Sequence, residues 1–143
     1  MWHAHEGGAR DKLAADQPGR LYPGVPYDYA AVAPPGGVLF TPALVRSTPR
    51  GRHRARRLEA QARQALDNLA ATLAEGGSTL SQVLKTTVRV ATSERSALVR
   101  VWAVVQERFA PARPPSTLLG VAVLGYPEQL VEIDAIAAVD GAA

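Results

Sequence analysis

Glu132 and Asp134, near the end of the chain, are the residues whose type and spacing best suit chemistry. They stand two positions apart in a β-type run from Leu130 to Val139, so both side chains are expected on one face of a strand. Burying an unpaired charge is costly, so such carboxylates need a partner or a function. One interpretation is a general acid or base whose pKa is tuned by partial burial. The other is a structural salt bridge to Arg89 or Lys85 on another strand.

Other common catalytic motifs are missing from the sequence. The chain has no cysteine, and His53 is the only histidine outside the first 20 residues, so no pair of a nucleophile and a histidine is available. His3 and His5 would need further converging ligands to hold a metal, so neither a metal nor another cofactor is expected. Gly36-Gly37 precedes a strand-like run, which favours a hairpin turn over a phosphate-binding loop.

The positive charge of the chain is concentrated in one segment. The 143 residues include 16 basic and 13 acidic side chains, a net charge of +3, and six arginines lie between Arg46 and Arg57 with no acid among them. Without these six, ten basic residues face 13 acidic ones. The segment offers phosphate affinity, but it has no Phe, Tyr or Trp on which bases could stack. A solvated loop is therefore the preferred interpretation, and a nucleic-acid partner is not expected.

The length of the chain suits one domain with one core. Residues 1–20 are polar and contain glycine and proline, which predicts a disordered tail followed by a folded domain over residues 21–143. Tyr27–Ala33 and Val38–Thr41 are short β-type runs around a Pro-Pro-Gly-Gly turn, which predicts a hairpin. No apolar run is long enough to cross a bilayer, so no membrane contact and a cytoplasmic location are expected.

Two helices are predicted to alternate with the remaining strands. Apolar residues recur at helical spacing from Leu58 to Leu73, and Gly76-Gly77 follows as a stop. A second helix is predicted to start from a cap at Thr92 or Ser93 and to end before Pro111. The strand between these helices is expected over residues 84–90, and the last two strands over residues 121–124 and 130–139.

The resulting order, ββαβαββ, predicts an α+β fold with a mixed sheet and both helices on one face. The other face of such a sheet would be left without cover. A large exposed apolar surface usually marks an interface, so the sequence predicts an oligomer.

Three blocks of the sequence resemble the Rid family, also called YjgF/YER057c/UK114: residues 61–69 (QARQALDNL), 83–88 (VLKTTV) and 130–137 (LVEIDAIA). Weaker matches extend the resemblance over residues 22–139. It implies a chorismate-mutase-like fold and a homotrimer whose sheets form a central barrel. Small-molecule ligands or substrates would then bind at the subunit interfaces.

RidA-like members hydrolyse reactive 2-imino or enamine acids to 2-keto acids and ammonia. The resemblance implies that Glu132 positions the attacking water and that Tyr27 closes the pocket. The arginine that grips the substrate carboxylate is not matched, because Ser116 stands at its position and Arg113 lies three residues earlier. The chain thus resembles the arginine-lacking subgroups. The expected substrate-binding residues are Tyr27, Arg113, Ser116, Leu118 and Trp102, although the spacing of Trp102 is also typical of a core or interface residue.

The expected function is water addition to a reactive imine, enamine or related small nitrogen metabolite, as in a deaminase or hydrolase. Weak or absent activity on 2-imino acids is expected, because the side chain of Ser116 carries no charge. The alternatives are a non-catalytic trimer that binds small ligands and, third, an RNA-binding or endoribonuclease-like protein. Residues 42–57 also depart from the family pattern, through either divergence or a local frame shift in the gene.

Overall fold

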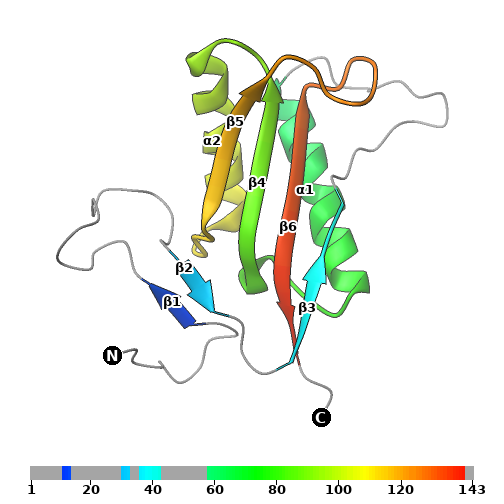
Figure 1. Ribbon diagram of the computed structural model, residues 1–143, viewed down its shortest axis with the longest axis vertical. Helices are drawn as coiled ribbons and strands as arrows, with labels where there is room; N and C mark the ends of the chain where they lie inside the picture. Colours follow the sequence, from blue (N-terminus) through cyan, green and yellow to red (C-terminus); the bar gives the residue numbers. More distant parts are fainter. Residues whose placement is uncertain (1–10, 14–29, 33–35, 43–57, 141–143) are drawn as a thin grey trace.

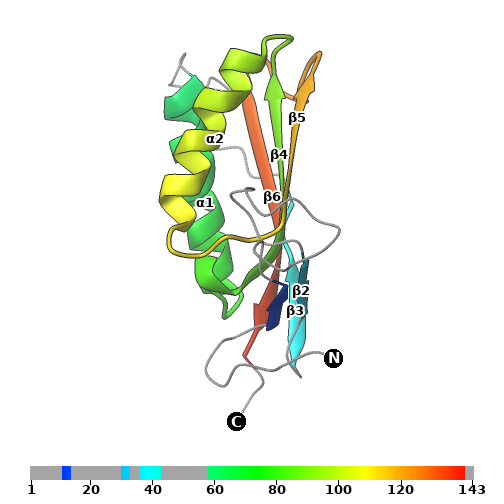
Figure 2. The same cartoon turned by 90° about the vertical axis from the view of Figure 1, so that its left-hand side faces the viewer.

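A four-stranded sheet with two helices on one face forms the main body of the described structure (Figures 1 and 2). The computed structural model describes residues 11–13, 30–32, 36–42 and 58–140. The sheet has the strand order β3-β6-β4-β5, in which β4 and β5 are parallel and the other neighbours are antiparallel. The elements are β1 (Asp11–Leu13), β2 (Ala30–Val32), β3 (Gly37–Phe40), α1 (Leu58–Glu75), the 3-10 helix η1 (Leu80–Gln82), β4 (Val83–Ala91), α2 (Arg95–Phe109), β5 (Ser116–Val121) and β6 (Val131–Val139).

Alternation along β4 and β6 gives the sheet two unlike faces. Val88 and Val90 of β4 and Ile133 of β6 are fully buried under the helices. Arg89 and Glu132 are register partners and project from the opposite side, which we call the open face. Figure 2 shows both helices on one side of the sheet, so the predicted α+β architecture is confirmed.

The core lies between this sheet and the two helices. Leu66, Leu69 and Leu73 of α1 are fully buried against strands and against α2, where Val101 is also fully buried. Burial of each such leucine stabilises the fold by roughly 2 kcal/mol before conformational entropy is counted. The helical spacing of these residues was therefore a sound indicator of the core face.

The end of α1 follows the predicted glycine stop. The N–H of Ser78 donates to the carbonyl of Leu73 at 2.8 Å, and the N–H of Gly77 donates to that of Ala74 at 3.1 Å. Gly77 has a φ of +79°, the left-handed conformation that glycine adopts with little strain. These bonds form a Schellman cap, which turns the chain back toward the sheet and into η1.

The predicted N-terminal hairpin is wrong. β2 pairs with β1 in a separate two-stranded antiparallel sheet, while β3 pairs with β6 at the edge of the main sheet. The nine-residue strand β6 needs a partner along its outer edge, and β3 supplies one with Leu39 packed on the core side. The strand Asp11–Leu13 also lies inside the segment predicted to be a tail.

Two further boundaries differ from the sequence prediction. The strand predicted over residues 121–124 is β5 at Ser116–Val121, because the ladder with β4 already begins where the N–H of Thr86 donates to the carbonyl of Pro115 at 3.0 Å. Proline is tolerated at the start of a strand, where its missing donor is not needed. The N-cap of α2 is Glu94, and Thr92 instead accepts a hydrogen bond from the N–H of Glu94 at 3.0 Å.

Candidate functional site

An ion-pair cluster occupies the centre of the open face. Arg89 Nη1 lies 2.9 Å from Asp134 Oδ2 and 3.6 Å from Glu132 Oε2. The shorter contact is a charge-assisted hydrogen bond, whereas the longer one exceeds hydrogen-bond distance. The hydrogen bond to Asp134 is the main reason why the pKa of Arg89 is raised. Arg89 is therefore the partner that the sequence suggested for the two carboxylates, and it binds Asp134 more closely than Glu132.

Glu132 retains hydrogen-bonding capacity in this arrangement. Its side chain is 21% exposed, and one of its oxygens, Oε2, makes the long contact with Arg89. An ionised carboxylate offers about four acceptor sites, so a single distant guanidinium leaves room for water or a ligand. The positive charge of Arg89 thus helps to hold the Glu132 carboxylate in place, while the carboxylate oxygens remain available to accept hydrogen bonds from other groups.

Lys85 lies on the same face of β4 and makes a different set of contacts. Its nitrogen Nζ donates to Thr117 Oγ1 at 2.6 Å and to the carbonyl of Thr86 at 3.1 Å. Burial lowers the pKa of Lys85, and the carboxylate of Asp134 partly opposes this effect. The open face therefore carries a lysine held by two neutral oxygens beside a guanidinium neutralised by carboxylates.

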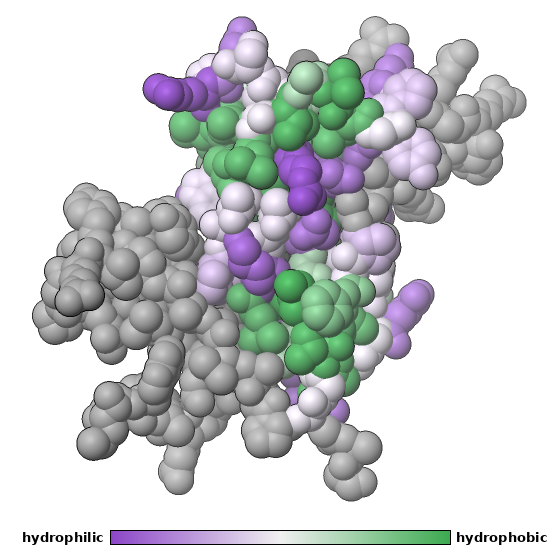
Figure 3. Space-filling model, in the orientation of Figure 1, coloured by the Kyte–Doolittle hydropathy of each residue, from purple (hydrophilic) through white to green (hydrophobic). Residues whose placement is uncertain are grey.

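Apolar side chains flank these polar residues. Figure 3 views the open face and shows a hydrophilic band across its middle, between hydrophobic regions on either side. Val38 and Phe40 of β3 are 42% and 73% exposed, and Leu119 of β5 is 44% exposed. Their register places them on the open face with Arg89 and Glu132.

Three of the expected substrate-binding residues meet on the helix side of the sheet. Trp102, Arg113 and Ser116 line a cavity of about 10 Å³ between α2 and the start of β5. Such a volume admits at most about one water molecule. The hydroxyl of Ser116 donates to the carbonyl of Pro114 at 2.9 Å and shares a 2.7 Å hydrogen bond with the hydroxyl of Thr86.

The other expected residues lie elsewhere. Leu118 follows Ser116 on the helix side and packs against the core. Tyr27 lies outside the described residues. Ser116 is the register partner of Thr86, whereas Glu132 is the partner of Arg89, three positions along β4. Within one chain, the sheet therefore separates Glu132 from Ser116.

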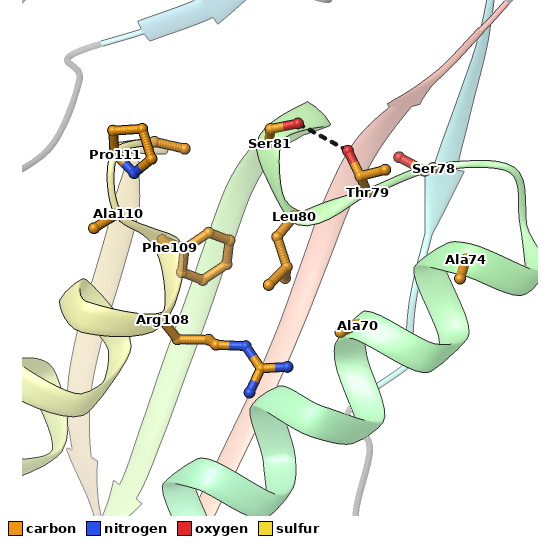
Figure 4. Close-up of a pocket in the computed structure, with 11 residues that line it drawn as sticks. Ala70, Ala74, Ser78, Thr79, Leu80, Ser81, Arg108, Phe109, Ala110 and Pro111 are labelled. Atoms are coloured by element: carbon orange, nitrogen blue, oxygen red, sulfur yellow. Dashed lines mark hydrogen bonds between the residues drawn. The ribbon is translucent and has the colours of Figure 1, made fainter.

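A larger hollow of about 540 Å³ lies between the C-terminal ends of the helices and η1. Figure 4 shows Phe109 and Leu80 on its wall, and the hydroxyls of Thr79 and Ser81 hydrogen-bonded to each other at 2.8 Å. Arg108 extends across it from α2 and forms an ion pair with Asp67 of α1. Of the expected substrate-binding residues that the structure describes, none lines this hollow.

Among the described residues, no group of three or more His, Cys, Asp or Glu side chains is placed to hold a metal ion. Within the same part of the chain, no helix combines the length and apolar character needed to cross a membrane.

Comparison with known proteins agrees with the fold. Residues 20–139 match the family described as endoribonuclease L-PSP. A Yersinia pestis protein of unknown function, YyfB of the conserved Rid protein family, has 27% identity and a TM-score of 0.80 over 92% of this chain and 99% of its own. The chain belongs to the Rid family.

Two other solved structures are similar at comparable identity. Rv2704 from Mycobacterium tuberculosis, a member of the YjgF/YER057c/UK114 family, is 28% identical with a TM-score of 0.63, over 79% of this chain and 86% of its own. A putative endoribonuclease from Thermotoga maritima is 30% identical with a TM-score of 0.57, over 82% and 89%. No curated protein has a detectable sequence match to this Rid chain.

Sequence reasoning treated Lys85 only as a salt-bridge partner. Its contact with Thr117 depends on the parallel register between β4 and β5, which brings together residues 32 positions apart. In the sequence, Lys85 stands near the start of an alternating strand and within the block 83–88 that resembles the Rid family. The Rid family match does not by itself assign this residue a role.

Proposed function

We propose that this Rid protein adds water to small imines or enamines and releases ammonia, at pockets that form between copies of the chain. For an imine the reaction is RR′C=NH + H2O → RR′C=O + NH3. The observation that supports it is the position of Glu132, whose carboxylate lies on the open face while the hydrogen bond of Arg89 goes to Asp134. A cytoplasmic setting, where such reactive imines arise, is part of the proposal.

Glu132 acts in this proposal by orienting water. A carboxylate that accepts a hydrogen bond from water aims the oxygen lone pair at the electrophilic imine carbon and can take up the proton as the C–O bond forms. Arg89, 3.6 Å away, helps to fix the position of the carboxylate through its positive charge. Lys85 and Thr117 lie on the same face and add polar groups to the pocket.

The proposed substrates lack a carboxylate. Ser116 has no charge, and its hydroxyl is already engaged with Thr86 and Pro114. A charge-assisted bidentate contact contributes about 2–3 kcal/mol, so its loss lowers the efficiency on 2-imino acids by roughly 30- to 150-fold. An uncharged imine loses nothing from the same change.

A second copy of the chain is needed to complete the site in this proposal. The cavity at Ser116 is too small for an organic ligand, and Glu132 lies on the opposite face of the sheet. Exposed apolar side chains on the open face, including Phe40 and Leu119, favour burial against another copy. A homotrimer would cover these residues and could bring the two halves of a pocket together.

The test compares two substrates generated in situ. A serine dehydratase supplies 2-iminopropanoate, and an amine oxidase supplies an imine without a carboxylate, with ammonia release measured above the uncatalysed rate. We expect acceleration of the uncharged imine and weak or absent activity on 2-iminopropanoate. Ser116→Arg should raise the activity on 2-iminopropanoate, whereas the matched control Ser116→Thr should not. Acceleration of neither substrate would refute the proposal.

One observation favours a second candidate, a non-catalytic small-ligand-binding trimer. Arg89 contacts both carboxylates, as expected if Glu132 and Asp134 only stabilise the sheet. In that case a ketone or imine would raise the melting temperature while ammonia release stayed at the uncatalysed rate. RNA cleavage, which the family description suggests, ranks third and is measured with a single-stranded RNA probe.

A further inference from the structure

We propose that Lys85 is the covalent centre of the reaction and forms an imine with uncharged carbonyl compounds and with the imines derived from them. This inference rests on the proposed function for its role in turnover. The formation of an adduct can be tested without turnover.

The two contacts of Lys85 can be made by a neutral amine as well as by an ammonium. A neutral amino group has two N–H donors and one lone pair, and Nζ has two acceptors, Thr117 Oγ1 at 2.6 Å and the Thr86 carbonyl at 3.1 Å. Both acceptors are neutral oxygens. If they hold the two N–H groups, the lone pair points away from them and is available to attack a carbon.

The charges around Lys85 permit this neutral form. Among the described residues, no carboxylate lies within 4.0 Å of its Nζ, so no ion pair holds the group as an ammonium. In the part of the chain that the structure describes, the charged groups on the same face are Asp134, Glu132 and Arg89, and Arg89 forms an ion pair with each of the two carboxylates. Burial lowers the pKa of Lys85 more than Asp134 raises it, which increases the neutral fraction near pH 8 relative to an ordinary lysine.

The covalent route balances without an oxidant or a cofactor. Lys85 attacks the substrate carbon, a C–N bond forms, and after proton transfer the original C–N bond breaks: Lys–NH2 + RR′C=NH → Lys–N=CRR′ + NH3. Water then adds to the new imine: Lys–N=CRR′ + H2O → Lys–NH2 + RR′C=O. Splitting hydrolysis into these two steps is the usual advantage of a lysine nucleophile.

Reductive trapping tests the adduct directly. The full-length protein is incubated with acetone and sodium cyanoborohydride, which converts a lysine imine into a stable isopropyl amine, and the modified peptides are quantified by mass spectrometry. Lys12 is the only other lysine in the chain and serves as an internal reference. We expect labelling of Lys85 at least about tenfold faster than that of Lys12 at pH 7.5, with the pH profile of Lys85 labelling displaced to lower pH.

Variants separate a catalytic amine from a structural one. Lys85→Arg keeps a cation but cannot form an imine, and should retain the wild-type circular dichroism spectrum while losing ammonia release from the uncharged imine. Lys12→Arg should leave Lys85 labelling unchanged. Equal labelling rates for Lys85 and Lys12 would contradict the proposal that Lys85 forms the imine preferentially. Wild-type ammonia release by Lys85→Arg would overturn its role in turnover but leave the proposed function intact. Selective labelling of Lys85 without any ammonia release would support the amine site and refute the proposed function.

Discussion

Replacing Arg89 by methionine should destabilise the protein by about 2 kcal/mol. The side chains of Arg89, Glu132 and Asp134 are 34%, 21% and 31% exposed, between fully buried and fully exposed ion pairs. Exposed pairs contribute about 0.2–1 kcal/mol, and breaking a buried pair costs about 3–5 kcal/mol, so an intermediate value is expected. The loss arises because two neighbouring carboxylates are left on one strand without their cation.

The two arms of this cluster should contribute unequally. At 2.9 Å the Arg89–Asp134 contact is a charge-assisted hydrogen bond, with an expected coupling energy of about 1–2 kcal/mol. At 3.6 Å the Arg89–Glu132 contact is an ion pair alone, with about 0.2–1 kcal/mol expected. Double-mutant cycles with Asp134→Asn and Glu132→Gln, measured by urea unfolding at low salt, give both values. A coupling to Glu132 equal to or larger than that to Asp134 would refute the reasoning that leaves Glu132 available for water.

Three further predictions concern the fold and its assembly. Gly77→Ala should lower the free energy of unfolding by about 1 kcal/mol in urea, because the φ of +79° strains an L side chain. An unchanged urea midpoint would contradict the inferred need for glycine in this helix cap. Ser116→Ala should lower the free energy of unfolding by about 1 kcal/mol, because the buried Thr86 hydroxyl loses this hydrogen-bond partner. The double variant Ser116→Ala with Thr86→Val should recover most of that loss. If the effects of the two substitutions on stability simply added, the hydrogen bond would not be the cause. Phe40→Glu should dissociate the proposed trimer in analytical ultracentrifugation, while Val99→Glu, at a similarly exposed site on α2, should leave it intact. A wild-type protein that sediments as a monomer would refute the trimer itself.

The parts of the fold that sequence could predict are those governed by local pattern and burial. Leu66 and Leu69 at helical spacing located the core face of α1, and the alternation of Val88 with Arg89 located the buried and open faces of β4. Gly77 marked the end of a helix because its left-handed φ is a local requirement. The pairing of Arg89 with the carboxylates was also among the stated alternatives.

The remaining features depend on contacts between distant segments. The strand pairing of β3 with β6, in place of a hairpin, is a choice among sheet edges that no local motif specifies. β5 begins directly after Pro115 because the parallel ladder with β4 begins there, and the same ladder joins Lys85 to Thr117. The sequence could not predict a complete substrate pocket, because the two proposed halves, at Ser116 and at Glu132, lie on opposite faces of the sheet within one chain.

The most direct measurement of the central claim is ammonia release from an uncharged imine by the wild type, by Glu132→Gln and by the neighbouring control Asp134→Asn. If Glu132 positions the attacking water, Glu132→Gln should lower the rate by about 100-fold or more. Asp134→Asn removes an equal charge two residues away but leaves the Glu132 carboxylate in place, so it should lower the rate far less than Glu132→Gln does. A folded Glu132→Gln variant that releases ammonia within about twofold of the wild-type rate would contradict the account.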